Sequence, residues 1–146
     1  MKTELHILLV EDNEGDIVLA REALREGKLL NRLSVARDGE EAIDFLHARG
    51  RFAGADRPDL ILLDINLPRI DGHEVLAYIK NDPLLKLIPV VMLTTSSSDK
   101  DVHDAYANYA NCYITKPVDL EKFMTIIHKI ETFWLSIVKL PTRIEA

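Results

Sequence analysis

The sequence predicts an α/β fold built on an open, parallel, doubly wound sheet. Short apolar runs, rich in leucine and β-branched residues, alternate with amphipathic segments at helical spacing. The apolar runs show almost no alternation with polar residues, which is typical of strands that are covered on both faces. Strand and helix alternate five times along the chain. Right-handed crossovers turn such units into one sheet with helices on both sides.

Each element follows from its own stretch of sequence. The expected strands are Leu5–Val10, Leu33–Ala36, Leu60–Leu63, Ile88–Leu93 and Cys112–Ile114. The expected helices lie around Ile17–Leu24, Ala42–Leu46, Val75–Ile79, Val102–Tyr109 and Phe123–Ile137, where apolar residues recur three and four positions apart. Asp38, with Glu41 three residues later, predicts a helix N-terminus of the capping-box type, and Asp119 predicts another N-cap.

Length and composition bound the class of protein. The chain has 146 residues, 47% of them hydrophobic, which fits one domain over residues 1–146, with a core of about 4–138, a short tail of 139–146 and no separate output domain. With 18 basic and 24 acidic residues, the net charge of −6 argues against a nucleic-acid partner. Cys112 is the only cysteine, which excludes an intramolecular disulfide and a cysteine-rich zinc site.

Two further expectations concern location and histidines. The sequence has no signal peptide and no stretch of 18 apolar residues, so we expect a cytoplasmic protein without a membrane partner. The five histidines show no metal-ligand spacing and are interpreted as surface or rim residues.

Chemically active side chains follow four of the expected strands. Glu11 and Asp12 follow the first strand, Asp64 the third, Thr94 the fourth and Lys116 the fifth. Ligands of open α/β sheets bind beyond the carboxyl ends of the strands. A single acid there is more often a turn residue or a helix cap, but the convergence of four strand ends indicates a site. Three neighbouring carboxylates repel one another unless a cation neutralises them, and Mg²⁺ suits oxygen ligands, while a lysine suits a phosphoryl oxygen.

Four strings resemble the receiver domain of two-component response regulators: LLVEDNEGD, DLILLDINLPRIDG, PVVMLTT and YITKP. The resemblance runs from about His6 to Trp134 and implies a (βα)5 flavodoxin-like fold with strand order 2-1-3-4-5. The strings NEGD, SSSDKDV and FWLSIVKLP resemble the stand-alone regulators that pair with phytochrome kinases.

The resemblance implies a role for each residue at the strand ends. Asp64 would accept the phosphoryl group. Asp12 would bind the metal directly and Glu11 through water, and the backbone carbonyl of Asn66 would complete the protein ligands. The implied metal is Mg²⁺, for which Mn²⁺ or Ca²⁺ can substitute. Lys116 would bind the phosphoryl group.

A second set of implied residues concerns signalling. Thr94 would move toward the phosphoryl group, and Tyr113 would occupy the aromatic switch position and rotate inward. Pro117 follows Lys116 as in the family, where the bond between them is typically cis, so we expect a cis bond here.

The implied function is a phosphoacceptor that is not an enzyme with an external substrate. A sensor histidine kinase, expected to be of the phytochrome type, would donate the phosphoryl group, and a phosphorylation-dependent protein-interaction surface would carry the signal. Phe133, Trp134 and Ile137 either pack on the sheet or form a self-association surface, and we predict a homodimer through this last helix. Two alternatives stay open: a binding module that works without phosphorylation, and a Mg²⁺-dependent small-molecule phosphatase.

Overall fold

The computed structural model describes residues 4–27 and 30–141, except for the side chains of residues 135–137. Five parallel strands form one sheet in the order β2-β1-β3-β4-β5, which confirms the predicted fold and strand order. The strands are β1 (Leu5–Val10), β2 (Asn31–Ala36), β3 (Leu60–Leu63), β4 (Val90–Thr94) and β5 (Cys112–Thr115).

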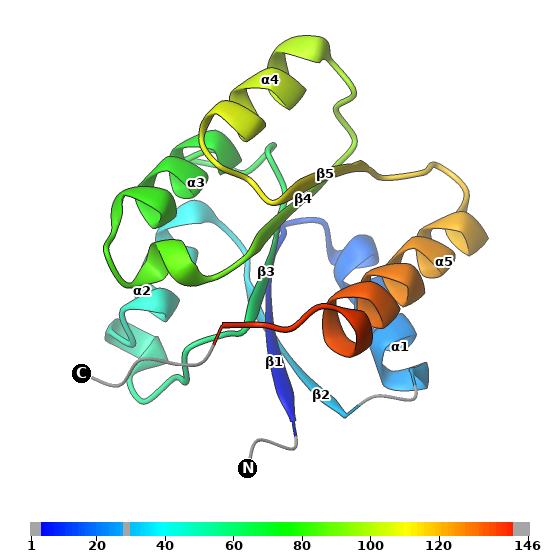
Figure 1. The fold of residues 1–146 in the computed structure, drawn as a ribbon, viewed down its shortest axis with the longest axis horizontal. Coiled ribbons are helices and arrows are strands. Elements are labelled where there is room, and N and C mark those ends of the chain that lie inside the picture. Colours follow the sequence, from blue (N-terminus) through cyan, green and yellow to red (C-terminus); the bar gives the residue numbers. More distant parts are fainter. Residues whose placement is uncertain (1–3, 28–29, 142–146) are drawn as a thin grey trace.

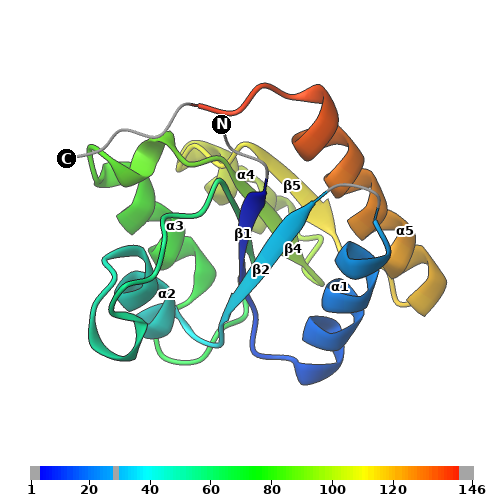
Figure 2. The same ribbon diagram turned by 90° about the horizontal axis from the view of Figure 1, so that it is seen from below.

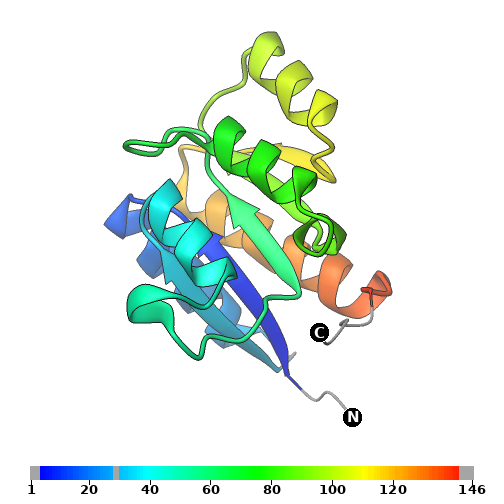
Figure 3. The same cartoon turned by 90° about the vertical axis from the view of Figure 1, so that its left-hand side faces the viewer.

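Five α-helices cover the two faces of this sheet. They are α1 (Glu14–Glu26), α2 (Gly39–Leu46), α3 (Gly72–Asn81), α4 (Asp99–Ala107) and α5 (Leu120–Ile130). Helices α1 and α5 lie side by side on one face, and α2, α3 and α4 cover the other (Figure 1). The view from below shows the same layers, and the side view shows α2, α3 and α4 in succession across the near face (Figures 2 and 3). Within the described ranges, none of the helices is long and apolar enough to cross a bilayer.

The strands are apolar on both sides because both sides are covered. In β1, Leu8 and Val10 pack into the core under α2, α3 and α4, whereas Ile7 and Leu9 pack into the core under α1 and α5. Successive side chains of a strand point to opposite faces, so a strand buried on both faces needs an uninterrupted apolar run. The predicted caps are confirmed: Asp38 accepts from the amide of Glu41, and Asp119 accepts from that of Lys122.

The end of the last helix differs from the expectation. After Ile130 the chain continues as a π-helical stretch, Glu131–Ile137. Trp134 is buried in the core beside Cys112, so of the two alternatives for this residue the structure shows packing on the sheet and not a self-association surface. Its spacing explains this, because Ile127, Ile130 and Trp134 continue one buried stripe. Phe133 is half exposed, and the side chain of Ile137 lies outside the described residues.

His6 is a second correction, because it is fully buried rather than at the surface. Its Nε2 lies 2.7 Å from Ser34 Oγ, and its Nδ1 lies 3.4 Å from the carbonyl oxygen of Arg57. A neutral imidazole satisfies both contacts by donating from Nδ1 and accepting at Nε2. Burial, helped by the charge of Arg32, lowers the pKa of His6, although the charges of nearby aspartates oppose this.

Gly72 allows α3 to start directly against the loop that follows β3. A Cβ at this position would lie 2.1 Å from the backbone oxygen of Asp64 and 2.6 Å from Cα of Ile65. The amide of Gly72 donates to the carbonyl of Ile65 at 2.8 Å, so the approach is also hydrogen-bonded. Only glycine fits without moving the backbone that carries Asp64.

Replacing Gly72 with alanine should therefore destabilise the protein. We expect Gly72→Ala to lower the free energy of unfolding by about 2–3 kcal/mol, because the atoms it meets belong to the backbone. Gly15→Ala is the matched control: its Cβ meets only the Oδ1 of Asn13, at 3.2 Å. Alanine is favoured there by up to about 1 kcal/mol, because position 15 is helical. Urea unfolding of the three proteins measures both effects, and equal stabilities would contradict the close approach.

The burial of His6 predicts a stability that falls in mild acid. The folded protein keeps His6 neutral to a lower pH than the unfolded chain does. Below about pH 6.5 the unfolded state therefore binds a proton that the folded state does not, at a cost of up to about 1.4 kcal/mol per pH unit. Urea unfolding between pH 5 and 8 should show a shallower pH dependence for His6→Gln than for the unmodified protein. His103→Gln, which removes a histidine with an 83% exposed side chain, should leave the slope unchanged.

Candidate functional site

Three carboxylates meet at the carboxyl edge of the sheet. Glu11 and Asp12 follow β1, and Asp64 follows the neighbouring β3. One oxygen from each of the three lies within 4.8 Å of the others. Glu11 and Asp64 are buried, whereas Asp12 is exposed and faces the entrance from solvent. The structure thus brings together the acids that the sequence places at separate strand ends.

Lys116 enters this cluster from the end of β5. Its Nζ donates to a carboxylate oxygen of Glu11, to Asp16 Oδ2 at 2.8 Å and to Asp64 Oδ2 at 3.2 Å. The lysine side chain is only 4% exposed. Its three N–H donors are therefore shared among three carboxylates that come from β1, α1 and β3.

Burial opposes the ionisation of Lys116 and of Glu11, and pairing outweighs this effect only for the lysine. Burial alone would lower the pKa of Lys116, but its hydrogen bonds to Asp16 and Glu11 and the charge of Asp64 outweigh that effect, so this pKa is raised. Burial raises the pKa of Glu11, and the hydrogen bond from Lys116 opposes the rise. The ammonium of Lys116 and the carboxylate of Glu11 thus each favour the charged form of the other.

The donor set fits a hard divalent cation. All three side chains of the cluster offer carboxylate oxygens, and Asp12 is open to water, which Mg²⁺ retains among its ligands. Asn66 lies in the loop just after Asp64, and its amide donates to Asp64 Oδ1 at 3.4 Å. The repulsion among three adjacent carboxylates gives such a cation its electrostatic advantage.

Thr94 and Tyr113 lie beside the cluster and share one neighbour. Thr94, at the end of β4, is fully buried, and its Oγ1 accepts from the amide of Ser96 at 3.4 Å. The hydroxyl of Tyr113 donates to the carbonyl oxygen of Ser96 at 2.8 Å. The backbone amide of Lys116 donates to the carbonyl of Thr94 at 2.7 Å. The loop after β4 therefore contacts both expected switch residues.

The expected cis bond before Pro117 is wrong for this structure, since the described residues contain no cis peptide bond. Lys116 reaches the carboxylates with the trans isomer. The physical reason is that the two isomers of a bond before proline differ little in free energy, so the surrounding fold selects between them.

Two contacts near the site were missed by sequence reasoning. Asp16 binds Lys116 although the two are 100 residues apart in the chain. Asp101 of α4 accepts from Ser96 Oγ at 2.5 Å and lies 3.0 Å from His73 Nε2 at the start of α3. The sequence did hold one signal for the contact between Asp16 and Lys116: Asp16 follows Glu11 and Asp12 by about one helical turn. Nothing in the spacing of His73 and Asp101 indicated the second.

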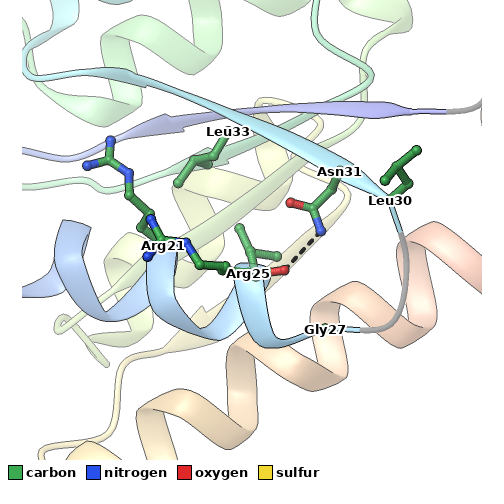
Figure 4. Close-up of a pocket in the computed structure, with 7 residues that line it drawn as sticks. Arg21, Arg25, Gly27, Leu30, Asn31 and Leu33 are labelled. Carbon is green, nitrogen blue, oxygen red and sulfur yellow. Dashed lines mark hydrogen bonds between the residues drawn. The ribbon is translucent and has the colours of Figure 1, made fainter.

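The cavity in Figure 4 is separate from this cluster. It has a volume of about 400 Å³ and lies between the carboxyl-terminal half of α1 and the start of β2. Its lining includes Arg21, Arg25, Leu30 and Leu33, and Asn31 beside them donates to the carbonyl of Leu24 at 3.1 Å. The carboxylates and Lys116 gather instead at the amino-terminal end of α1, so this cavity takes no part in their chemistry.

Comparisons with known proteins agree with this geometry. A curated relative, the response regulator Rcp1 of Synechocystis sp., is 47% identical over 135 residues, which cover 92% of each chain. A solved structure of Rcp1 in its Mn²⁺-bound form superimposes with a TM-score of 0.91 at 46% identity, covering 94% of this chain and 99% of that one.

A second solved structure and the family model also match this chain. The phosphorylated cyanobacterial phytochrome response regulator RcpA matches with a TM-score of 0.92 at 50% identity, over 95% of this chain and 99% of that one. The model of the response regulator receiver domain matches residues 7–128. The protein therefore belongs to the response regulator receiver domain family.

Proposed function

We propose that this protein is a cytoplasmic phosphoacceptor switch built on its receiver domain. Asp64 accepts a phosphoryl group from the phosphohistidine of a sensor histidine kinase. The observation that carries the proposal is the environment of Asp64: a buried carboxylate that receives a hydrogen bond from Lys116 and adjoins Glu11 and Asp12. The family match and the likeness to a phosphorylated regulator support it.

The transfer step uses the residues of the cluster. A carboxylate oxygen of Asp64 attacks phosphorus in line, the new O–P bond forms, and the P–N bond to the kinase histidine breaks, leaving the imidazole with the electron pair. Lys116 already donates to Asp64, so its ammonium is in place to donate to a phosphoryl oxygen carried by the same carboxylate. The burial of Lys116 strengthens this interaction, because few waters compete for the ammonium.

Glu11, Asp12, Asp64 and the backbone carbonyl of Asn66 are the proposed holders of a divalent cation. We propose Mg²⁺, with Mn²⁺ or Ca²⁺ as substitutes, because the oxygen-only donors suit these ions. Receiver domains bind divalent metal, and Rcp1 has been solved with Mn²⁺. Such an ion supplies positive charge to the phosphoryl oxygens during transfer.

Thr94 and Tyr113 are the proposed switch. A phosphoryl group on Asp64 offers the hydroxyl of Thr94 a new acceptor, and movement of Thr94 toward it draws Oγ1 away from the amide of Ser96, from which it now accepts. Tyr113 holds the same Ser96 through its hydroxyl, so movement of the loop after β4 changes the environment of Tyr113. The surface around α4, β5 and α5 then carries the signal to a protein partner.

The proposed donor is a phytochrome-type histidine kinase. The support is the similarity of nearly the whole chain to RcpA, which is described as a phytochrome response regulator. The two alternatives have less support. A small-molecule phosphatase of this design needs a second acid two residues after the nucleophile, where Asn66 stands, and a binding-only module does not require Asp12, Asp64 and Lys116 together.

Phosphorylation of Asp64 is directly testable. Incubation with Mg²⁺ and acetyl phosphate should add one phosphoryl mass to the intact protein. Asp64→Asn, or an excess of EDTA, should abolish the increment, because the nucleophile or the cation is then lost. Asp44→Asn, which removes an exposed aspartate paired with Arg49, is the matched control and should behave as the unmodified protein does. Phosphorylation that persists in Asp64→Asn, or steady turnover of a phosphoester, would rule out the proposed function.

We also propose a homodimer through the last helix and its neighbours. Phe133 is 50% exposed and stacks edge-to-face on Trp134, so a bulky apolar ring is held rigidly at the surface. Rigid aromatic side chains are enriched at protein interfaces.

The dimer predicts that Phe133→Ser lowers the dimer fraction, because it removes an apolar ring from the interface. Sedimentation velocity over a range of concentrations, with and without acetyl phosphate and Mg²⁺, measures that fraction. Leu84→Ser, a similar loss of an exposed apolar side chain in the loop after α3, should leave the fraction unchanged. Monomers throughout the range, even for the unmodified protein, would exclude the dimer.

A further inference from the structure

Asp16 is a fourth carboxylate at the site, and it contacts Lys116 rather than the other acids. It lies in the first turn of α1, and its Oδ2 is 2.8 Å from Lys116 Nζ. The side chain of Asp16 is 26% exposed, compared with 2% for Glu11 and 8% for Asp64. Asp16 therefore holds the ammonium from the solvent side, while Glu11 and Asp64 hold it from within.

The position of Asp16 in α1 does not by itself account for this contact. Asp16 is three residues after the N-cap, Asn13, where an acidic side chain commonly accepts the amide hydrogen of the cap residue. Here the amide of Asn13 donates to Glu11 Oε2 at 3.2 Å instead. The carboxylate of Asp16 is directed across the site to Lys116, so its role in the helix terminus is limited to the attraction of its charge for the helix dipole.

Asp16 also stands apart from the group that could share a cation. Within the described ranges, the acids whose oxygens converge are Glu11, Asp12 and Asp64, and Asp16 does not join them. Lys116 does overlap with that group, because it donates to both Glu11 and Asp64. The ammonium and a divalent cation therefore compete for the same oxygens.

We propose that Asp16 is a positioning residue that holds Lys116 toward α1 and so leaves the oxygens of Glu11 and Asp64 available to a divalent cation. The inference rests on the metal site of the proposed function. Without Asp16, the flexible lysine stem lets the ammonium move onto the two buried carboxylates. A cation must then displace it, and binding weakens.

Calorimetric titration of the metal-free protein with MgCl₂ tests this directly. Asp16→Ala should raise the dissociation constant for Mg²⁺ by about tenfold, the size expected for the loss of one charge-assisted hydrogen bond. Asp16→Asn keeps an oxygen that can accept from Lys116, so its dissociation constant should lie between those of Asp16→Ala and the unmodified protein. Glu14→Ala is the matched control, since it removes a 64% exposed acid of the same helical turn that pairs with Arg37. It should change the constant by less than about twofold.

A double-mutant cycle separates positioning from simple loss of negative charge. If Asp16 acts through Lys116, Asp16→Ala should have no effect on Mg²⁺ affinity in a Lys116→Met background. A loss of affinity that is equally large in both backgrounds would overturn the proposal. Should Lys116→Met fail to fold, the single variants decide, because charge loss alone makes Asp16→Asn and Asp16→Ala equally weak binders.

The same titrations distinguish failure of this inference from failure of the proposed function. No Mg²⁺ binding by the unmodified protein would refute the metal site itself. Normal binding by the unmodified protein, with unchanged affinity in Asp16→Ala, would overturn only the role of Asp16. Urea unfolding in EDTA adds a metal-free readout, in which the effects of Asp16→Ala and Lys116→Met should be strongly non-additive, and additivity would count against the contact.

Discussion

The site depends on one ammonium that is shared among carboxylates from three separate elements. Lys116 donates to Glu11, Asp16 and Asp64, and two of these acids are almost fully buried. Buried anions without a partner are strongly unfavourable, and two that adjoin each other are more so. Lys116 therefore keeps the acidic edge of the resting sheet intact. It also occupies oxygens that a cation would need, so under the proposed function this interaction would have to rearrange when a cation binds.

The parallel ladder explains how residues so distant in sequence reach one point. Glu11, Asp64 and Lys116 each come directly after a strand, and each still donates its backbone amide to the next strand: to Ala36 at 3.0 Å, Val10 at 3.1 Å and Thr94 at 2.7 Å. These last backbone hydrogen bonds of the sheet thus fix the backbone of all three residues. Their side chains leave from a rigid edge, which is the condition for preorganised electrostatics.

Because the strands are regular, the sequence could predict the fold and the meeting of the acids at the sheet edge. It could not predict contacts that depend on how separate elements pack together. Apolar runs locate strands, and strand ends locate Glu11, Asp12, Asp64 and Lys116. The contact between Asp16 and Lys116 depends on how α1 packs beside α5 on one face of the sheet, which no local pattern records. The burial of His6 could in principle have been predicted, since a strand covered on both faces buries every residue, polar ones included. For Trp134 the sequence left core packing and self-association open, because the turn after Ile130 is π-helical and its geometry cannot be read from apolar spacing.

The loops that flank the cluster contact α3 and α4, and these contacts are the ones that the proposed switch would use. Gly72 seats the start of α3 on the backbone of Asp64, and the adjacent His73 contacts Asp101 of α4. Asp101 in turn holds Ser96, the neighbour that Thr94 and Tyr113 share. His73, Asp101 and Ser96 therefore form a chain of polar contacts from the start of α3 to the loop after β4. Because Ser96 is bonded directly to Asp101 of α4, the proposed displacement of the loop after β4 would act on α4 through that contact.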